Sequence, residues 1–439
     1  MEWSRLIPTG RHGDPPREDR PMTPDRTPFQ RDYDRIVFSS AFRRLHDKTQ
    51  VFPLPDNDLV HSRLTHSLEV ACVGRSLGAI VGQKVIERGE LPSWCSARDF
   101  GDIVAAACLA HDIGNPPFGH SGEDAIASWF LGAGKEHLEG LSPAERTDLE
   151  QFEGNAQGFR ILTRLQMPAQ PGLKLTHATL AAFTKYPRAS APKGEGMPLK
   201  KHGFHQAEAS FFEQVANAVS LTRTASMWTR HPLAFLVEAA DDICYAILDL
   251  EDGMRVGHVD FRLARDLLVP IASAGRNFRE HGRGDDEKEY VGYLRARAIN
   301  NLIQEASQAF LAHEKAALSG TLVDALTKLI ESRPLLKTIK DETRARCYEA
   351  KEVLEIELAG YEVLYYLLET LVGATRATTP SKREEKVLKL LPHDPRAPAL
   401  SPYQRLLVIT DYLSGMTDGY AVSLFRRFRG VALPTLGAR

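Results

Sequence analysis

Residues 111–123 read HDIGNPPFGHSGE and combine two histidines, an aspartate and a glutamate with a Gly/Pro break. The run before them, residues 99–110 (DFGDIVAAACLA), is apolar and alanine-rich, which predicts a buried helix that ends at His111 and Asp112. The Gly/Pro break stops that helix, and Ser121 is placed to cap the next one. A histidine and an aspartate at a helix end can both turn toward one metal ion, but a complete site needs a further histidine and a further carboxylate.

A further histidine lies in the preceding helical segment. Residues 61–89 carry apolar side chains at helical spacing, and Arg63 and His66 lie on nearby faces of the predicted helix. A lone histidine on an apolar helix is more often a packed core residue than a ligand. His66 becomes a ligand candidate because the pair at residues 111–112 needs a partner.

A further carboxylate comes from residues 232–253, PLAFLVEAADDICYAILDLEDG. This run predicts a long apolar helix, in which embedded acids are costly unless they are paired or bind a metal. Asp241, Tyr245 and Asp249 fall at positions i, i+4 and i+8 and share one face, whereas Asp242 lies about 100° away. The stripe favours Asp241 as the ligand; a different helix register would make it Asp242.

The combined donor set consists of two imidazoles and two carboxylates: His66, His111, Asp112 and Asp241. A mixed N/O set suits Mn, Fe, Ni, Co or Zn, and the lack of cysteine argues against a structural zinc site. Such a metal polarises a phosphoryl oxygen and activates water. His120 and Glu123 follow on the next turn as an acid–base pair. The residue types therefore predict metal-assisted hydrolysis of a phosphate ester or anhydride.

Composition limits the remaining possibilities. The chain has 439 residues, 43% of them hydrophobic, and a net charge of −2, so no global charge favours nucleic acid or a membrane surface. No apolar run is long enough to span a membrane, no secretory signal is evident, and the five cysteines form no CxxC pair, which predicts a cytoplasmic protein with reduced thiols.

Periodicity predicts an all-α fold, because strand signals are almost absent. Residues 1–29 are rich in proline and charge and predict an extended N-terminal arm, either a free tail or a contact with a neighbouring subunit. We expect a helical core over residues 30–257 and a C-terminal helical region over residues 258–439.

The motifs around these residues resemble those of one enzyme family. The H…HD…D pattern is that of the HD phosphohydrolase superfamily, which also includes enzymes acting on nucleoside monophosphates or signalling nucleotides. Seven motifs resemble the deoxyguanosine triphosphate triphosphohydrolase (dNTPase) family, in family order: SSAFRRLHDKTQVFP, RLTHSLEV, HDIGNPPFGHSGE, FEGNAQGFRIL, LAAFTKYP, EAADDICYAILDLED and DYLSGMTDGYA. The resemblance spans residues 30–421 and implies an HD-domain core that hydrolyses a dNTP to the deoxynucleoside and tripolyphosphate.

Carried over by position, the resemblance also implies residue roles. His66, His111, Asp112 and Asp241 match the metal ligands, with Mn or Mg as the favoured metal, and His120 and Glu123 match the catalytic pair. The implied substrate contacts are Gln50 at the sugar 3′-hydroxyl, Val51 where a 2′-hydroxyl would sit, Tyr245 and Asp249 at the sugar, and Arg63, Asn155 and Lys185 at phosphate or substrate. Some relatives have a second histidine where Asn115 stands, which places more of the acid–base role on His120.

The resemblance further implies a homo-oligomer, a tetramer or hexamer, with an activating dNTP or single-stranded DNA as modulators. Two other functions stay open on the sequence. One is a different HD-type nucleotide phosphohydrolase. The other is a nucleic-acid-binding protein with a vestigial site, which the balanced charge disfavours.

Overall fold

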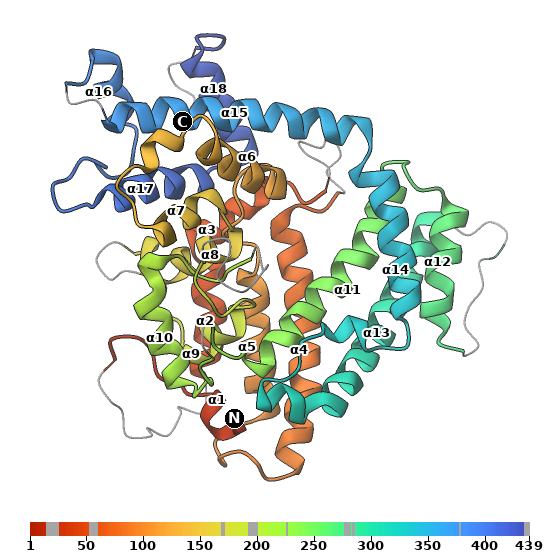
Figure 1. The fold of residues 1–439 in the computed structure, drawn as a ribbon. Coiled ribbons are helices and arrows are strands. Elements are labelled where there is room, and N and C mark those ends of the chain that lie inside the picture. Colours follow the sequence, from red (N-terminus) through yellow and green to blue (C-terminus); the bar gives the residue numbers. More distant parts are fainter. Residues whose placement is uncertain are drawn as a thin grey trace.

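The computed structural model describes residues 1–14, 26–51, 60–167, 172–191, 201–224, 227–275, 282, 286–376 and 379–433. Within these ranges no strand forms, and extended segments meet only at isolated bridges such as Ala189 with Phe204 (Figure 1). The all-α prediction is confirmed.

The α-helices are, in chain order, α1 (Trp3–Leu6), α2 (Pro28–Val37), α3 (Ser40–Arg43), α4 (Arg63–Glu87), α5 (Ala97–Ala110), α6 (Gly119–Leu131), α7 (Pro143–Glu150), α8 (Gly154–Arg160), α9 (His177–Phe183), α10 (Ala209–Ala218), α11 (Pro232–Arg255), α12 (Phe261–Ser273), α13 (Glu287–Ser319), α14 (Arg333–Thr343), α15 (Lys351–Arg376), α16 (Lys382–Leu388), α17 (Pro402–Ser414) and α18 (Asp418–Phe428). Short 3-10 and π turns join some of them: η1 (Arg44–Asp47), η2 (Lys135–Leu138), η3 (Ile161–Leu165), η4 (Gln206–Glu208), η5 (Leu326–Lys328) and η6 (Arg344–Tyr348).

Helices α4, α5 and α11 form the centre of the molecule and run side by side (Figure 1). The contact between α4 and α5 is close because Gly74, Gly78 and Gly82 recur every fourth residue on α4. A Cβ atom at Gly78 would lie 2.6 Å from the carbonyl oxygen of Phe100, and one at Gly82 would lie 2.8 Å from Cβ of that residue. The glycine stripe therefore lets two backbones meet where side chains would hold them apart.

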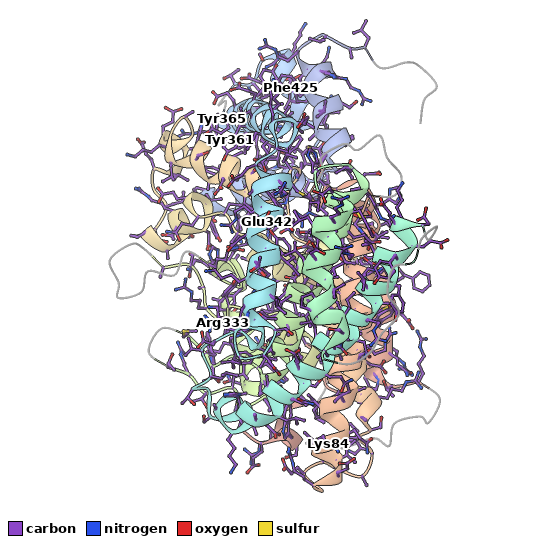
Figure 2. All side chains as sticks on the ribbon, turned by 90° about the vertical axis from the view of Figure 1, so that its right-hand side faces the viewer. Lys84, Arg333, Glu342, Tyr361, Tyr365 and Phe425 are labelled. Atoms are coloured by element: carbon purple, nitrogen blue, oxygen red, sulfur yellow. The ribbon has the colours of Figure 1, made fainter. Side chains whose placement is uncertain are left out.

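Two apolar clusters surround this centre. The larger contains the buried faces of α4, α5, α9, α10, α11, α12 and α13. The smaller joins α6 and α7 to α15, α17 and α18, so the C-terminal helices cover the segment that begins at residue 118. In Figure 2, Lys84 near the end of α4 lies at one end of the molecule, and Tyr361, Tyr365 and Phe425 lie at the other. The metal-ligand candidates lie on α4, on α11 and at the end of α5.

The first residues differ from the extended arm that we expected. Residues 3–6 form α1, and Trp3, Leu6 and Ile7 are buried in the larger cluster. The Trp3 ring lies 5.1 Å from the ring of Phe100 and 6.3 Å from that of Phe310, and its indole N–H donates to Glu314. Three apolar side chains at helical spacing outweigh the polar composition of the segment. Residues 15–25, the proline-rich part of the expected arm, lie outside the described residues.

Two further findings concern the whole chain. All five cysteines are free, and four of them are buried. Among the described helices, none is long and apolar enough to cross a membrane. The boundaries that we expect near residues 30 and 258 stay predictions.

Candidate metal centre and substrate pocket

Three potential metal ligands meet where α4, α5 and α11 pack together. His66 lies in the first turn of α4, His111 caps the end of α5, and Asp241 belongs to the middle of α11. Asp241 Oδ1 is 3.2 Å from His66 Nε2 and 3.4 Å from His111 Nε2. The donor atoms of all three residues lie within 4.8 Å of one another. Residues far apart in sequence thus converge on one point.

Asp112, the fourth expected ligand, lies at the edge of this group. Its Oδ1 is 3.5 Å from His111 Nε2 and accepts a hydrogen bond from Asn115 Nδ2 at 2.7 Å. Its Oδ2 pairs with the buried guanidinium of Arg63. Asn115 therefore orients this carboxylate.

The donor atoms fit a divalent metal. His111 Nδ1 lies 2.7 Å from the carbonyl oxygen of Cys108, which leaves the buried Nε2 atom without a hydrogen-bond partner among the described residues. An imidazole held in this way through its other nitrogen is the usual form of a metal-binding histidine. Burial opposes the charged form of His111, but Asp112 and Asp241 raise its pKa. The site therefore favours a positive charge, which a proton or a metal ion can supply.

The structure also distinguishes the two adjacent aspartates of α11. Asp241 faces the two histidines. Asp242 points to the other side, where it accepts hydrogen bonds from Thr327 at 2.6 Å and from Lys340 at 2.8 Å. The helical register is the one that the i, i+4, i+8 stripe predicts, so the geometry favours Asp241.

A cavity of about 120 Å³ opens beside His111, Asp112 and Asp241. Its charged and polar lining residues include His120, Glu123, Glu153, Asn155, Lys185 and Lys201. Lys185 Nζ is 3.2 Å from Glu238, and Lys201 Nζ is 3.6 Å from Glu153. Asn155 donates to Glu153 at 2.6 Å. Ammonium groups beside a metal-type site are suited to hold an anion such as a phosphate.

His120 and Glu123 enter this cavity from the first turn of α6. That helix begins at Gly119 after Phe118, which has a left-handed backbone with φ of 63°. The expectation that Ser121 caps this helix is therefore wrong. The earlier start places His120 and Glu123 on one face, since they are three residues apart.

The two side chains have different environments. Glu123 is buried, and Gly154 N–H donates to its Oε1 at 2.6 Å. Burial, followed by repulsion from Glu153, raises the pKa of Glu123 to about 8. His120 also lines the cavity. Its loss of solvation on burial lowers its pKa, and the positive charge of Arg63 lowers the pKa further. A weakly basic imidazole beside a carboxyl group of high pKa can exchange protons near neutral pH.

Gln50 and Val51 line an adjoining cavity of about 90 Å³, together with Arg63, His120 and Tyr348. Gln50 Oε1 is buried and has no hydrogen-bond partner among the described residues, and Val51 is also buried. His120 lines both cavities. The structure thus places two of the expected sugar contacts, Gln50 and Val51, in a second cavity that shares His120 with the first.

Tyr245 and Asp249 line neither cavity and instead lie against Tyr348. The Tyr348 hydroxyl donates to Asp249 Oδ2 at 2.5 Å, and its ring stacks on Tyr245 with centroids 5.8 Å apart. Burial raises the pKa of Asp249 to about 8. These two residues of the α11 stripe are therefore connected to the second cavity through a third side chain.

Three site residues were missed from the sequence or left without a role. Tyr348 lies about a hundred positions after α11 and has no local motif that marks it. Glu153 is part of the FEGN motif, and its position in that motif was the available signal. Lys201 lies toward the end of a lysine-rich segment. The composition of that segment shows its positive charge but not where it lies in the fold. Tertiary packing places all three at the cavities.

Comparison with known families agrees with this fold and site. The HD domain profile matches residues 63–153, which include both histidines and the aspartate at the end of α5. The profile of the phosphohydrolase-associated domain matches residues 331–427. The fold and the site define an HD-domain phosphohydrolase.

Full-length relatives narrow the family further. A deoxyguanosinetriphosphate triphosphohydrolase-like protein from Synechocystis is 45% identical over 99% of this chain and 100% of its own length. A protein of the same name from Pseudomonas aeruginosa is 41% identical with the same coverage. The deoxyguanosinetriphosphate triphosphohydrolase of Yersinia enterocolitica is 33% identical over 91% of this chain and 93% of its own. The chain belongs to the family of deoxyguanosinetriphosphate triphosphohydrolase-like proteins.

Proposed function

We propose that this chain is a metal-dependent dNTP triphosphohydrolase, which hydrolyses dGTP, other dNTPs or both to the deoxynucleoside and inorganic tripolyphosphate. The observation that carries the proposal is the buried Nε2 atom of His111, which has no hydrogen-bond partner among the described residues and faces His66 and Asp241 at the edge of a cavity lined by lysines. The names of the relatives support the choice of substrate.

The residues that would hold the metal are His66, His111, Asp112 and Asp241. When bound, a divalent ion supplies Lewis acidity toward a phosphoryl oxygen and lowers the pKa of a water molecule. Mn or Mg is the favoured ion, and the donor set also suits Fe, Ni, Co or Zn.

His120 would carry the proton that moves in the reaction. Water attacks the α-phosphorus, the bond from phosphorus to the 5′-oxygen breaks, and the leaving oxygen takes up a proton. His120 is placed to accept the proton of the water or to donate to the 5′-oxygen, because it lines both cavities. Glu123, one turn later on α6, would orient the imidazole.

The remaining residues would position the substrate. Arg63, Lys185 and Asn155 are proposed phosphate contacts, and Lys201 joins them because it lines the same cavity. Gln50 would accept a hydrogen bond from the 3′-hydroxyl, since its buried Oε1 atom has no hydrogen-bond partner among the described residues. Val51 would exclude a 2′-hydroxyl by its apolar bulk. Tyr245 and Asp249 would act on the sugar side through Tyr348.

Product analysis tests the proposal directly. Purified protein is incubated with Mn(II) or Mg(II) and with each dNTP, alone and as a mixture, and the products are separated by chromatography. Deoxynucleoside appearing together with tripolyphosphate is the expected result. Orthophosphate or pyrophosphate with a nucleotide product would instead indicate another HD-type nucleotide phosphohydrolase.

The predicted partners need separate tests. Turnover only in the dNTP mixture would reveal an activating dNTP site. A salt-dependent gel shift with single-stranded DNA tests a modulating or vestigial nucleic-acid-binding role. Light scattering distinguishes a tetramer from a hexamer.

A further inference from the structure

A second group of potential metal ligands lies outside the two cavities, between α7 and the segment that leads into η4. It consists of Asp148 on α7 and of His202 and His205. Asp148 Oδ1 is 3.8 Å from His202 Nε2 and 3.7 Å from His205 Nδ1. The three residues are at most 1% exposed. The group is therefore sealed from solvent, unlike the candidate catalytic centre.

The three atoms that face one another make no hydrogen bonds to other described residues. Asp148 Oδ1, His202 Nε2 and His205 Nδ1 are all buried, and none has a hydrogen-bond partner among the described residues. Leaving a single buried polar atom unsatisfied is unfavourable, because the atom loses its hydrogen bonds to water and gains none in return. Three such atoms around one point are hard to explain unless something occupies the point between them.

The second carboxylate oxygen of Asp148 and the second ring nitrogen of His205 have partners of their own, which hold these two side chains in place. Asp148 Oδ2 accepts hydrogen bonds from the Tyr403 hydroxyl and from the backbone N–H of Gln206, the latter at 2.7 Å. His205 Nε2 lies 3.4 Å from Gln157 Oε1. A second partner on the outer atom of a ligand is the arrangement that orients metal-binding carboxylates and imidazoles.

The backbone around the histidines is also anchored. The guanidinium of Arg188 donates to the carbonyl oxygen of Lys201 at 2.6 and 2.8 Å, and Gly203 N–H donates to the Arg188 carbonyl at 3.0 Å. The geometry is thus set by the fold and not by a flexible surface loop.

We propose that Asp148, His202 and His205 bind a second divalent ion, of the zinc type, with water as the fourth ligand. Two imidazole nitrogens and one carboxylate oxygen form a borderline donor set that suits zinc or cobalt. In a tetrahedral site with bonds of about 2.0–2.1 Å, ligand atoms are about 3.4 Å apart. The two distances from Asp148 Oδ1 to the histidine nitrogens, 3.8 and 3.7 Å, exceed this by a few tenths of an ångström, and the two nitrogens lie within 4.8 Å of each other.

The ion would fix the position of a segment that lines the proposed substrate pocket. It would tie α7 to the segment that begins with Lys201, the residue directly before His202. Lys201 lines the first cavity and lies 3.6 Å from Glu153. The site itself is buried, and none of its three proposed ligands lines either cavity. Its existence does not depend on the proposed reaction.

Metal counting separates the two sites. Protein without an affinity tag is loaded with Zn(II) or Co(II), passed through a desalting column and analysed by mass spectrometry of the metal. The variant His66→Ala/Asp241→Ala removes the first site and should retain about one ion per chain. Adding His202→Gln or His205→Gln should remove that ion, together with the visible absorption of four-coordinate Co(II). An empty His66→Ala/Asp241→Ala protein, or an ion that survives both glutamine substitutions, would overturn the proposal.

A matched control and a second method guard against misfolding. His231 is equally buried, but both of its ring nitrogens are hydrogen-bonded, to Leu6 and Leu233. His231→Gln should therefore keep the ion. If the His202 and His205 variants do not fold, anomalous diffraction from wild-type crystals at the zinc edge tests whether a zinc ion lies between the three side chains. A peak between the three side chains supports the site, and density with no anomalous signal shows a water molecule and refutes it.

Discussion

His120 is the residue whose position is most informative about the chemistry. It lines both the cavity next to the metal-ligand candidates and the cavity of Gln50 and Val51. A group that bridges the phosphate side and the sugar side is placed where the bond between them would break. Its neighbour Glu123 is held by Gly154, so the pair depends on the backbone of another helix.

Replacing His120 by alanine should reduce kcat by about 10²–10⁴-fold, because a positioned acid–base group contributes this much. Metal binding, measured by calorimetry with Mn(II), should be unchanged, since His120 is not among the converging ligands. His313→Ala on α13 serves as the control, because His313 lines neither cavity. Loss of the metal in His120→Ala would contradict the assignment.

Replacing Gly154 by alanine should displace the acid–base pair without touching it chemically. A Cβ atom there would lie 2.3 Å from Asn115 Oδ1 and 2.5 Å from Glu123 Oε1. Because a misplacement of about 1 Å can cost about 10²-fold, kcat should fall by a factor of that order. The matched control is Gly373→Ala, whose Cβ atom would meet open space. Steady-state kinetics on both variants tests this; equal kcat values would show that the carboxylate position is not critical.

At the scale of elements, α4 and α11 must keep their register, since one carries His66 and the other Asp241. The two helices are connected by His61, the residue before Ser62, which caps α4. His61 Nδ1 is 2.8 Å from Asp252 Oδ1 on α11, and His61 Nε2 is 3.0 Å from Glu69 Oε2 on α4. Burial lowers the pKa of His61, but the two carboxylates outweigh it and raise the pKa to about 10.

The raised pKa of His61 predicts a pH-dependent stability. The folded protein binds this proton more tightly than the unfolded chain, so the stabilisation is fully present below pH about 6.5 and is lost as pH rises toward 10. His61→Gln should therefore lower Tm most at pH 6–7, by an amount equivalent to about 2–4 kcal/mol. The difference in Tm from wild type should shrink steadily up to pH 10. A difference that is constant with pH would show that His61 is not charged in the folded protein.

At the scale of the whole molecule, the two apolar clusters are joined by buried polar contacts. Arg160, the last residue of α8, contacts Glu208 at 2.7 Å and Asp411 of α17 at 2.8 Å. Lys48 donates to the Ser414 carbonyl at 2.7 Å and also to that of Asn115. The C-terminal helices thus support the segment from which the proposed catalytic residues, His120 and Glu123, project.

Arg160→Met should destabilise the protein by about 3–5 kcal/mol, because two buried carboxylates lose their shared cation. Arg164→Met is the matched control. Its guanidinium is 3.9 Å from the same Glu208 and 45% exposed, so its loss should cost about 0–1 kcal/mol. Urea unfolding of both variants measures the difference. Equal midpoints would mean that the two clusters are held together without the Arg160 bridge.

The helices that carry the site were predictable because their periodicity is strong. The segments of α4, α5 and α11 lie where the apolar spacing indicates, and the stripe on α11 correctly turns Asp241, and not Asp242, toward the histidines. The start of α6 and the helix at residues 3–6 were missed. In both cases a local signal, a serine cap or a proline-rich composition, was overruled by packing against the core.

The sequence alone predicted the all-α class from periodicity, the candidate metal ligands from residue type, and the family from the resemblance of its motifs. Only the tertiary structure decided which side chains meet. Tyr348 reaches the second cavity, Lys201 reaches the first, and Asp148 meets His202 and His205. These juxtapositions join segments far apart in the chain. The physical reason is that helix packing, and not local spacing, brings such segments within bonding distance.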